Sequence, residues 1–114
     1  MTTVYIDNDR IEITGHSGNH DVCCMVSTLI NHFMYNASEN YGIHFDMFVT
    51  EDAHSVIRDL DILRADRRGE VLLDSLIYSF KLLAEDFPDN VRISERALKT
   101  TGCTADYCYL APAT

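Results

Sequence analysis

The segment from Arg10 to Phe33 reads R-I-E-I-T-G-H-S-G-N-H-D-V-C-C-M-V-S-T-L-I-N-H-F and contains three patterns in succession. Residues 10–14 alternate between apolar and polar side chains, which is typical of a half-buried strand. Residues 15–21 carry two glycines and an asparagine, which indicates a loop. An amphipathic helix is predicted next, because apolar residues then recur at helical spacing, at Val22, Val26, Leu29 and Phe33.

The neighbouring sequence extends this unit in both directions. Residues 3–7 also alternate, and Asn8-Asp9 is a turn signal, so we expect residues 3–7 and 10–14 to form a hairpin. Asp21 is a suitable N-cap for the helix, because its carboxylate can accept hydrogen bonds from the free amides of the first turn. We expect the helix to end near residues 37–41, before Gly42.

The second half of the chain repeats the pattern of paired strands followed by a helix. Residues 43–49 and 53–60 are predicted strands joined by a turn near Glu51-Asp52, and residues 61–69 are predicted to be a charged connection. A second helix is predicted before Pro88, which would stop it, with a broad apolar face made of Val71, Leu72, Leu73, Leu76, Ile77, Phe80, Leu83 and Ala84. Residues 91–94 are predicted to form a short last strand.

These elements define the expected fold class. The order β-β-α-β-β-α-β predicts an α/β protein of the α+β type, in which two helices pack on one face of a mainly antiparallel sheet. The 114 residues fit one compact domain. We expect this domain to span residues 1–99 and residues 100–114 to be an irregular C-terminal tail.

Composition limits the possible functions. The formal net charge of −9 argues against direct nucleic-acid binding and would favour a basic protein or peptide partner, although it is also explained by solubility alone. No apolar run approaches the roughly 20 residues of a membrane helix, and the first residues lack the features of a signal peptide, so we expect no membrane association and a cytoplasmic location. Four cysteines, Cys23, Cys24, Cys103 and Cys108, would then be reduced thiols.

The loop and the helix start hold the candidate catalytic groups. His16 lies in the glycine-bearing loop, and Cys23 follows in what would be the first helical turn. The partial positive charge and free amides of a helix N-terminus favour thiolate over thiol. A nearby imidazole could take the thiol proton and return it to a leaving amine, and the free amides could bind an oxyanion. The pattern is also compatible with an ordinary core cysteine beside an unrelated histidine.

The sequence resembles the Prp family of ribosomal-processing cysteine proteases. The resemblance rests on a strand followed by Gly15-His16, a small loop, Asp21, and Val22-Cys23 with Val26-Ser27. That family carries Gly-His, a glycine-containing loop and a run close to Asp-Ile-Val-Cys-Ala-Ala-Val-Ser. The general pattern of strands, leucine-rich helix and Phe-Pro extends the resemblance over about residues 4–93.

The resemblance implies a function and a site. It implies a small, homodimeric α/β cysteine protease in which His16 is the base and Cys23 is the nucleophile, without a cofactor. It further implies a substrate that is either a large-subunit ribosomal protein carrying an N-terminal extension or a phage structural protein with a similar cleavage motif.

Two departures from the family pattern keep other hypotheses open. The loop between His16 and Cys23 is several residues shorter than usual, and one residue is missing between Asp21 and the cysteine. Cys24 is therefore an alternative nucleophile, and His20 is an alternative base. A non-catalytic assembly or binding protein of the same fold is one further hypothesis, and a small zinc-binding protein that uses these residues or the tail cysteines is another.

Overall fold

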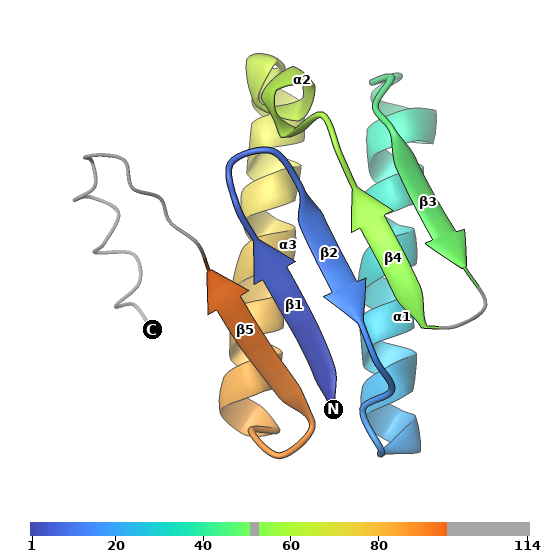
Figure 1. Ribbon diagram of the computed structural model, residues 1–114. Coiled ribbons are helices and arrows are strands. Elements are labelled where there is room, and N and C mark those ends of the chain that lie inside the picture. The colour runs from blue at the N-terminus through green and yellow to red at the C-terminus, as the bar shows by residue number, and fades with distance from the viewer. Residues whose placement is uncertain (51–52, 96–114) are drawn as a thin grey trace.

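The computed structural model describes residues 1–50 and 53–95 (Figure 1). The predicted turn at Glu51-Asp52 and the predicted tail, with Cys103 and Cys108, lie outside the described residues. The elements are β1 (Thr2–Ile6), β2 (Ile11–Thr14), α1 (His20–Tyr35), a π-helical turn (Asn36–Asn40), β3 (Met47–Thr50), β4 (His54–Ile57), α2 (Leu60–Ala65), α3 (Arg67–Asp86) and β5 (Val91–Glu95).

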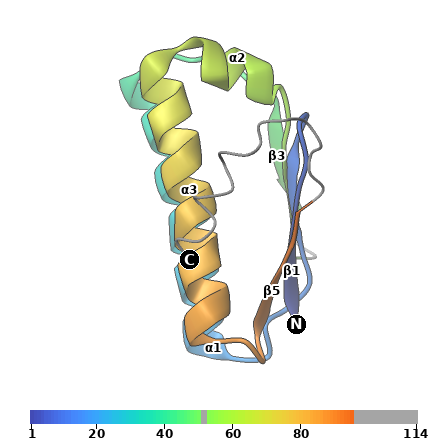
Figure 2. The same cartoon turned by 90° about the vertical axis from the view of Figure 1, so that its left-hand side faces the viewer.

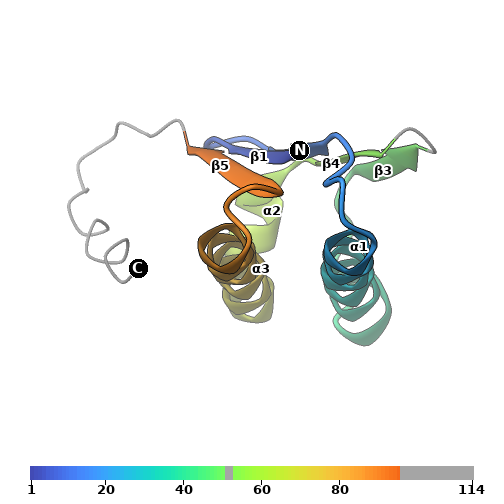
Figure 3. The same ribbon diagram turned by 90° about the horizontal axis from the view of Figure 1, so that it is seen from below.

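Five strands form one sheet in the order β3-β4-β2-β1-β5. The β3–β4, β4–β2 and β2–β1 pairs are antiparallel, whereas β5 runs parallel to β1. The helices α1 and α3 lie side by side on one face of this sheet, and α2 crosses between them and the sheet at one end (Figures 2 and 3). The predicted α+β class, with two long helices on one face of a mainly antiparallel sheet, is confirmed.

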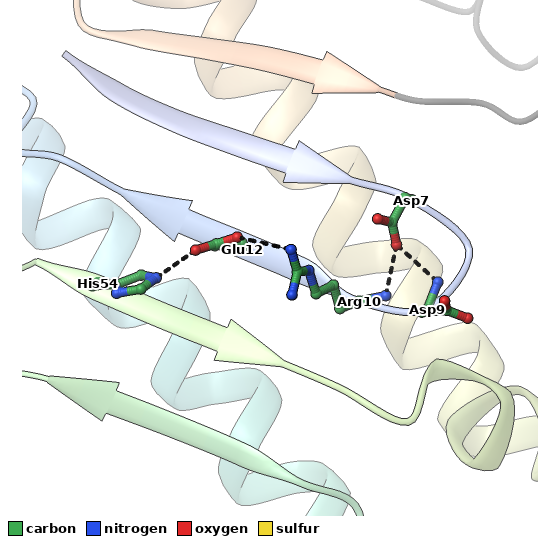
Figure 4. Close-up of polar contacts among 5 residues, drawn as sticks. All are labelled: Asp7, Asp9, Arg10, Glu12 and His54. Carbon is green, nitrogen blue, oxygen red and sulfur yellow. Dashed lines mark hydrogen bonds and ion pairs between the residues drawn. The ribbon is translucent and has the colours of Figure 1, made fainter.

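The β1–β2 hairpin is closed by the aspartate that directly follows its first strand. The Asp7 carboxylate accepts hydrogen bonds from the backbone amides of Asp9 and Arg10, at 2.9 and 3.0 Å (Figure 4). A side-chain acceptor of this kind stabilises a turn locally, without help from the rest of the fold. The predicted hairpin therefore forms where the turn signal lies.

The start of α1 corrects the sequence prediction. Asn19, and not Asp21, is the N-cap: its side-chain oxygen accepts from the amides of Asp21 and Val22, at 2.9 and 3.3 Å. Asn19 has extended backbone angles, as an N-cap requires, so the helix begins at His20. Cys23 is consequently the fourth helical residue, and not the second as an N-cap at Asp21 would make it.

Two further boundaries differ from the prediction. Residues 43–46 are not part of β3; the Ile43 amide instead donates to the Ala37 carbonyl at 2.9 Å, which ties this segment to the end of the first helical unit. The predicted charged connection 61–69 contains α2 and the start of α3. The segment forms the short helix α2 because Leu60 and Leu63, three residues apart, lie on one side of it and are buried.

The core lies between the sheet and the inner faces of the two long helices. The predicted apolar stripes are largely confirmed, with Ile30 buried more completely than Leu29 on α1. Val71, predicted to be part of the α3 face, is 51% exposed because it lies on the outer side of the helix. Among the residues that the structure describes, no helix is long and apolar enough to span a membrane.

Gly69 gives a stability prediction. It is a buried helical residue where a Cβ atom would lie 2.4 Å from the Leu63 carbonyl oxygen and 2.9 Å from the Ile43 side chain. Backbone cannot move away from such a contact cheaply, so Gly69→Ala is expected to lower the free energy of unfolding by about 1–3 kcal/mol despite the better helix propensity of alanine. Urea unfolding measures the effect. The exposed Ser75→Ala on the same helix is the control, and an equal stability of both variants would contradict the close α2–α3 packing.

Candidate active site

A cavity of about 330 Å³ lies at the end of the sheet where β2 leads into α1. It is bordered by the ends of β2 and β3, by the starts of β1 and β4, and by one side of α1 from Cys23 to Asn31. These elements approach one another in the lower part of Figure 1. Both predicted catalytic residues, His16 and Cys23, line it. Apolar side chains form part of its wall, namely Ile13, Val26, Ile30, Val49 and Ala53.

Cys23 is half-buried, and its sulfur has a polar neighbour. The Cys23 Sγ lies 3.1 Å from the Ser17 Oγ. The hydrogen bond from the Ser17 side chain lowers the pKa of the Cys23 thiol, the backbone amides of Ser17 and Gly18 add to this lowering, and burial opposes it. The lowering of the Cys23 pKa thus comes mainly from Ser17 in the loop, and not from the helix N-terminus to which the sequence analysis attributed it.

The amides of the helix start are not the expected oxyanion donors. Those of Asp21 and Val22 are bound by the Asn19 side chain, and that of Cys23 donates to the Asn19 carbonyl at 3.0 Å. The backbone of Ser17 and Gly18 lowers the pKa of the Cys23 thiol, so the amides of these two loop residues are the oxyanion donors that we expect in place of the helix amides. Gly18 has φ +85°, a backbone conformation that turns the loop back toward the helix start and that other residues rarely adopt.

His16 is an exposed residue on the edge of the cavity. Its backbone carbonyl accepts a hydrogen bond from the Met1 amine at 2.6 Å, which ties the backbone at His16 to the start of the chain. Among the hydrogen bonds of the described residues, none joins the His16 ring to the Cys23 sulfur. Catalytic pairs of this type are often separated in the free enzyme and close only around a substrate.

Cys24 has a different environment from Cys23. It is exposed, and its sulfur lies 3.6 Å from Nε2 of His20, one helical turn earlier. Neither residue lines the cavity described above. The alternative pair from the sequence therefore exists as a contact on the outer surface of α1, whereas His16 and Cys23 line the same open cavity.

Two residues of the site were missed by the sequence analysis. Ser17 is 3% exposed and contacts the thiol. Asn90, in the turn before β5, donates from its side-chain amide to the Ser17 carbonyl at 2.9 Å and so ties the loop to this turn. The position of Ser17 between His16 and Cys23 was a possible signal, but Asn90 lies 73 residues away and carried none.

His54, at the border of the cavity, bonds through Nε2 to Glu12 at 2.6 Å, and Arg10 lies on the other side of that carboxylate (Figure 4). Within residues 1–50 and 53–95, no three His, Cys, Asp or Glu side chains are grouped to hold a metal ion. The tail cysteines of that hypothesis lie outside the described residues.

The fold is thus an α+β domain in which the first long helix begins directly beneath a strand end and carries a thiol into a cavity. It is the fold of the ribosomal-processing protease Prp. A crystal structure of Prp from Staphylococcus aureus with a covalently linked product peptide aligns with a TM-score of 0.75 at 19% identity, covering 84% of this chain and 100% of that one. The Prp structure with a substrate peptide gives a TM-score of 0.71 at 20% identity, with coverage of 84% and 100%.

A protein from Streptococcus mutans shares the fold at a TM-score of 0.63 and 20% identity, covering 83% of this chain and 96% of that one. No protein-family model and no curated protein matches the sequence. The likeness therefore concerns the fold, and the fold of Prp is retained here although four-fifths of the aligned residues differ.

Proposed function

We propose that this protein is a cysteine endopeptidase that uses Cys23 as its nucleophile and His16 as its base. The observation that carries the proposal is the meeting of these two residues on one cavity, in a fold shared with a peptide-cleaving protease. The lowered pKa of the Cys23 thiol supports it, because the thiolate is the reactive form. Cys24 and His20 make contact on the surface but do not line this cavity.

The reaction follows from these groups. The His16 ring takes the Cys23 proton, and the thiolate attacks the scissile carbonyl carbon to give a tetrahedral oxyanion beside the Ser17 and Gly18 amides. Collapse breaks the C–N bond, and His16 returns the proton to the departing amine, which leaves a thioester on Cys23. Water, deprotonated by His16, attacks the thioester and releases the new C-terminal acid together with the thiol.

The proposed substrate is an N-terminal extension of a large-subunit ribosomal protein or the cleavage segment of a phage structural protein. The Prp structures that share this fold contain peptides, and the net charge of −9 would attract a basic protein. Peptides covering both kinds of segment, incubated with the purified protein and analysed by mass spectrometry, test the proposal. Cleavage of either at one bond supports it, and the preferred peptide separates the two substrates; intact peptides of both kinds contradict it.

Replacement of the base gives a prediction on the mechanism. His16→Ala is expected to lower kcat for peptide cleavage by about 10²–10⁴-fold, because general acid–base catalysis by one side chain is typically worth that much. His20→Ala, a histidine in the same segment, is expected to leave kcat close to that of the parent. The reverse result would transfer the base to His20 and make Cys24 the nucleophile.

A non-catalytic assembly partner is the second candidate. It is favoured by the observation that no described hydrogen bond joins the His16 ring to the sulfur, together with the short loop between them. It predicts that the His16→Ala and Cys23→Ala variants both bind the same ribosomal-protein and phage-protein peptides as tightly as the parent protein does.

A further inference from the structure

The Ser17 hydroxyl lies where it can act on the thiol directly. Ser17 is 3% exposed, and its Oγ has three partners within hydrogen-bonding distance: the Cys23 Sγ at 3.1 Å, the Asn19 amide at 3.1 Å and the Asn19 carbonyl oxygen at 2.8 Å. The Asn19 amide donates to the hydroxyl oxygen in any state. The single hydroxyl proton, however, can be given to only one of the other two partners.

The protonation state of Cys23 decides which partner receives this proton. When the sulfur is a thiol, its S–H can donate to the Ser17 Oγ and the hydroxyl donates to the Asn19 carbonyl. When the sulfur is a thiolate, it has no proton to give and becomes an acceptor. Rotation of the Ser17 O–H bond away from the Asn19 carbonyl then points its hydrogen at the thiolate sulfur.

This rotation leaves no buried group without a partner. The Asn19 carbonyl, which loses the hydroxyl proton, still accepts from the Cys23 backbone amide at 3.0 Å. A hydrogen bond to an ionised acceptor is roughly twice as strong as one between neutral groups. The exchange therefore favours the thiolate at little cost to the rest of the loop.

The loop is held so that the hydroxyl keeps its position. Asn90 donates to the Ser17 carbonyl, and the Asn90 carbonyl in turn accepts from the Thr2 amide at 2.9 Å. The loop that carries the hydroxyl is thus tied to the sheet as well as to the helix start. It does not depend on the side chain of His16 or on a bound peptide.

We propose that Ser17 is a positioning residue that stabilises the Cys23 thiolate by a switchable hydroxyl hydrogen bond, so that the thiol gives up its proton to His16 more readily. The inference deepens the proposed function and, for its catalytic meaning, rests on it. It assigns to a neighbouring serine the role that a permanent thiolate–imidazolium contact has in other cysteine proteases.

Alkylation of Cys23 as a function of pH tests the proposal without any cleavage. The sequence has no Lys or Arg between Arg10 and Arg58, so trypsin releases one peptide that contains only Cys23 and Cys24 among the cysteines. In a Cys24→Ser background this peptide reports Cys23 alone. Iodoacetamide treatment of the folded protein over a pH series, followed by mass spectrometry, gives the pH midpoint of Cys23 alkylation.

Two variants with side chains of the same shape distinguish the effect of the hydroxyl group from the effect of side-chain volume. Ser17→Thr and Ser17→Val add the same volume, but only threonine keeps a hydroxyl. Relative to Ser17→Thr, the Ser17→Val protein is expected to have a Cys23 midpoint higher by about one pH unit, as for loss of one hydrogen bond to a charged group. Ser17→Ala is expected to raise the midpoint by a similar amount relative to the Cys24→Ser parent.

Asn90→Ala is the structural control, because it releases the same loop but keeps the hydroxyl. Because Asn90 helps to hold the hydroxyl in place, the midpoint of this variant is expected to rise, but by clearly less than that of Ser17→Ala, and this smaller rise supports the proposal. Equal midpoints in the Thr and Val variants, or an Asn90→Ala shift as large as that of Ser17→Ala, would overturn it. Thermal unfolding of each variant identifies those that do not fold.

The last test compares the alkylation midpoints of Cys23 and Cys24 in proteins that keep Ser17. The same tryptic peptide from a Cys23→Ser protein reports Cys24, and Cys23 must ionise at a lower pH than Cys24 if the proposal holds. Equal midpoints for the two cysteines reject it even if every Ser17 variant unfolds. Absence of peptide cleavage combined with a Ser17-dependent midpoint would reject the protease function and leave the thiolate stabilisation intact.

Discussion

Cys23→Ala is expected to lower kcat/KM for peptide cleavage by at least about 10³-fold, which is the scale of loss when a covalent nucleophile is removed. Within the part of the chain that the structure describes, no other thiol lines the cavity, so no second cysteine there can replace it. The fold should survive, because Cys23 is only half-buried and alanine is a good helix former. Product formation is measured by liquid chromatography at matched protein concentrations.

Cys24→Ala is the matched control for this loss. Cys24 is exposed on the same helical turn and contacts His20 but not the cavity. Its replacement is expected to leave kcat/KM within about twofold of the parent, as for a surface change that removes no catalytic group. If Cys24→Ala is inactive and Cys23→Ala is active, the nucleophile is Cys24 and the cavity is not the substrate site.

Phe80→Ala is expected to have the largest effect on stability, a loss of about 3–5 kcal/mol in the free energy of unfolding. The Phe80 ring is fully buried at 0% exposure, on the face of α3 that packs against the sheet. Its removal takes away the buried apolar surface and leaves a cavity that the surrounding strands and helices fill only in part. Because a domain of this size is stable by about 5–15 kcal/mol, a large share of its stability would be lost.

Tyr78→Ala, on the opposite side of the same helix, is the control for Phe80→Ala. Tyr78 is 53% exposed, so its replacement is expected to change the unfolding free energy by less than about 1 kcal/mol. Denaturant titration followed by circular dichroism measures both variants. Similar losses for Phe80 and Tyr78 would contradict the orientation of α3, and with it the position of the core.

Much of the architecture could be predicted because it is recorded in local patterns. The strand alternation of residues 10–14, the turn after Asp7 and the apolar stripe from Val22 to Phe33 each reflect a period set by backbone geometry. The candidate pair was found for the same reason, since His16 and Cys23 are separated by one short loop. The errors lie where two local readings compete: Asn19 and Asp21 are both good caps, and the extended backbone of Asn19 selects the first.

By itself, therefore, the sequence determined the fold class, the two long helices and the segment that holds the thiol. Tertiary structure alone decided that β5 pairs parallel with β1, that the chain around Leu60 forms a helix, and that Asn90 holds the loop above Cys23. The sequence analysis expected free helix amides near the sulfur, but Asn19 binds those of Asp21 and Val22. The group beside the sulfur is instead the Ser17 hydroxyl. The physical reason is that a hydrogen bond between distant segments leaves no periodic trace in the sequence and arises only when packing brings them together.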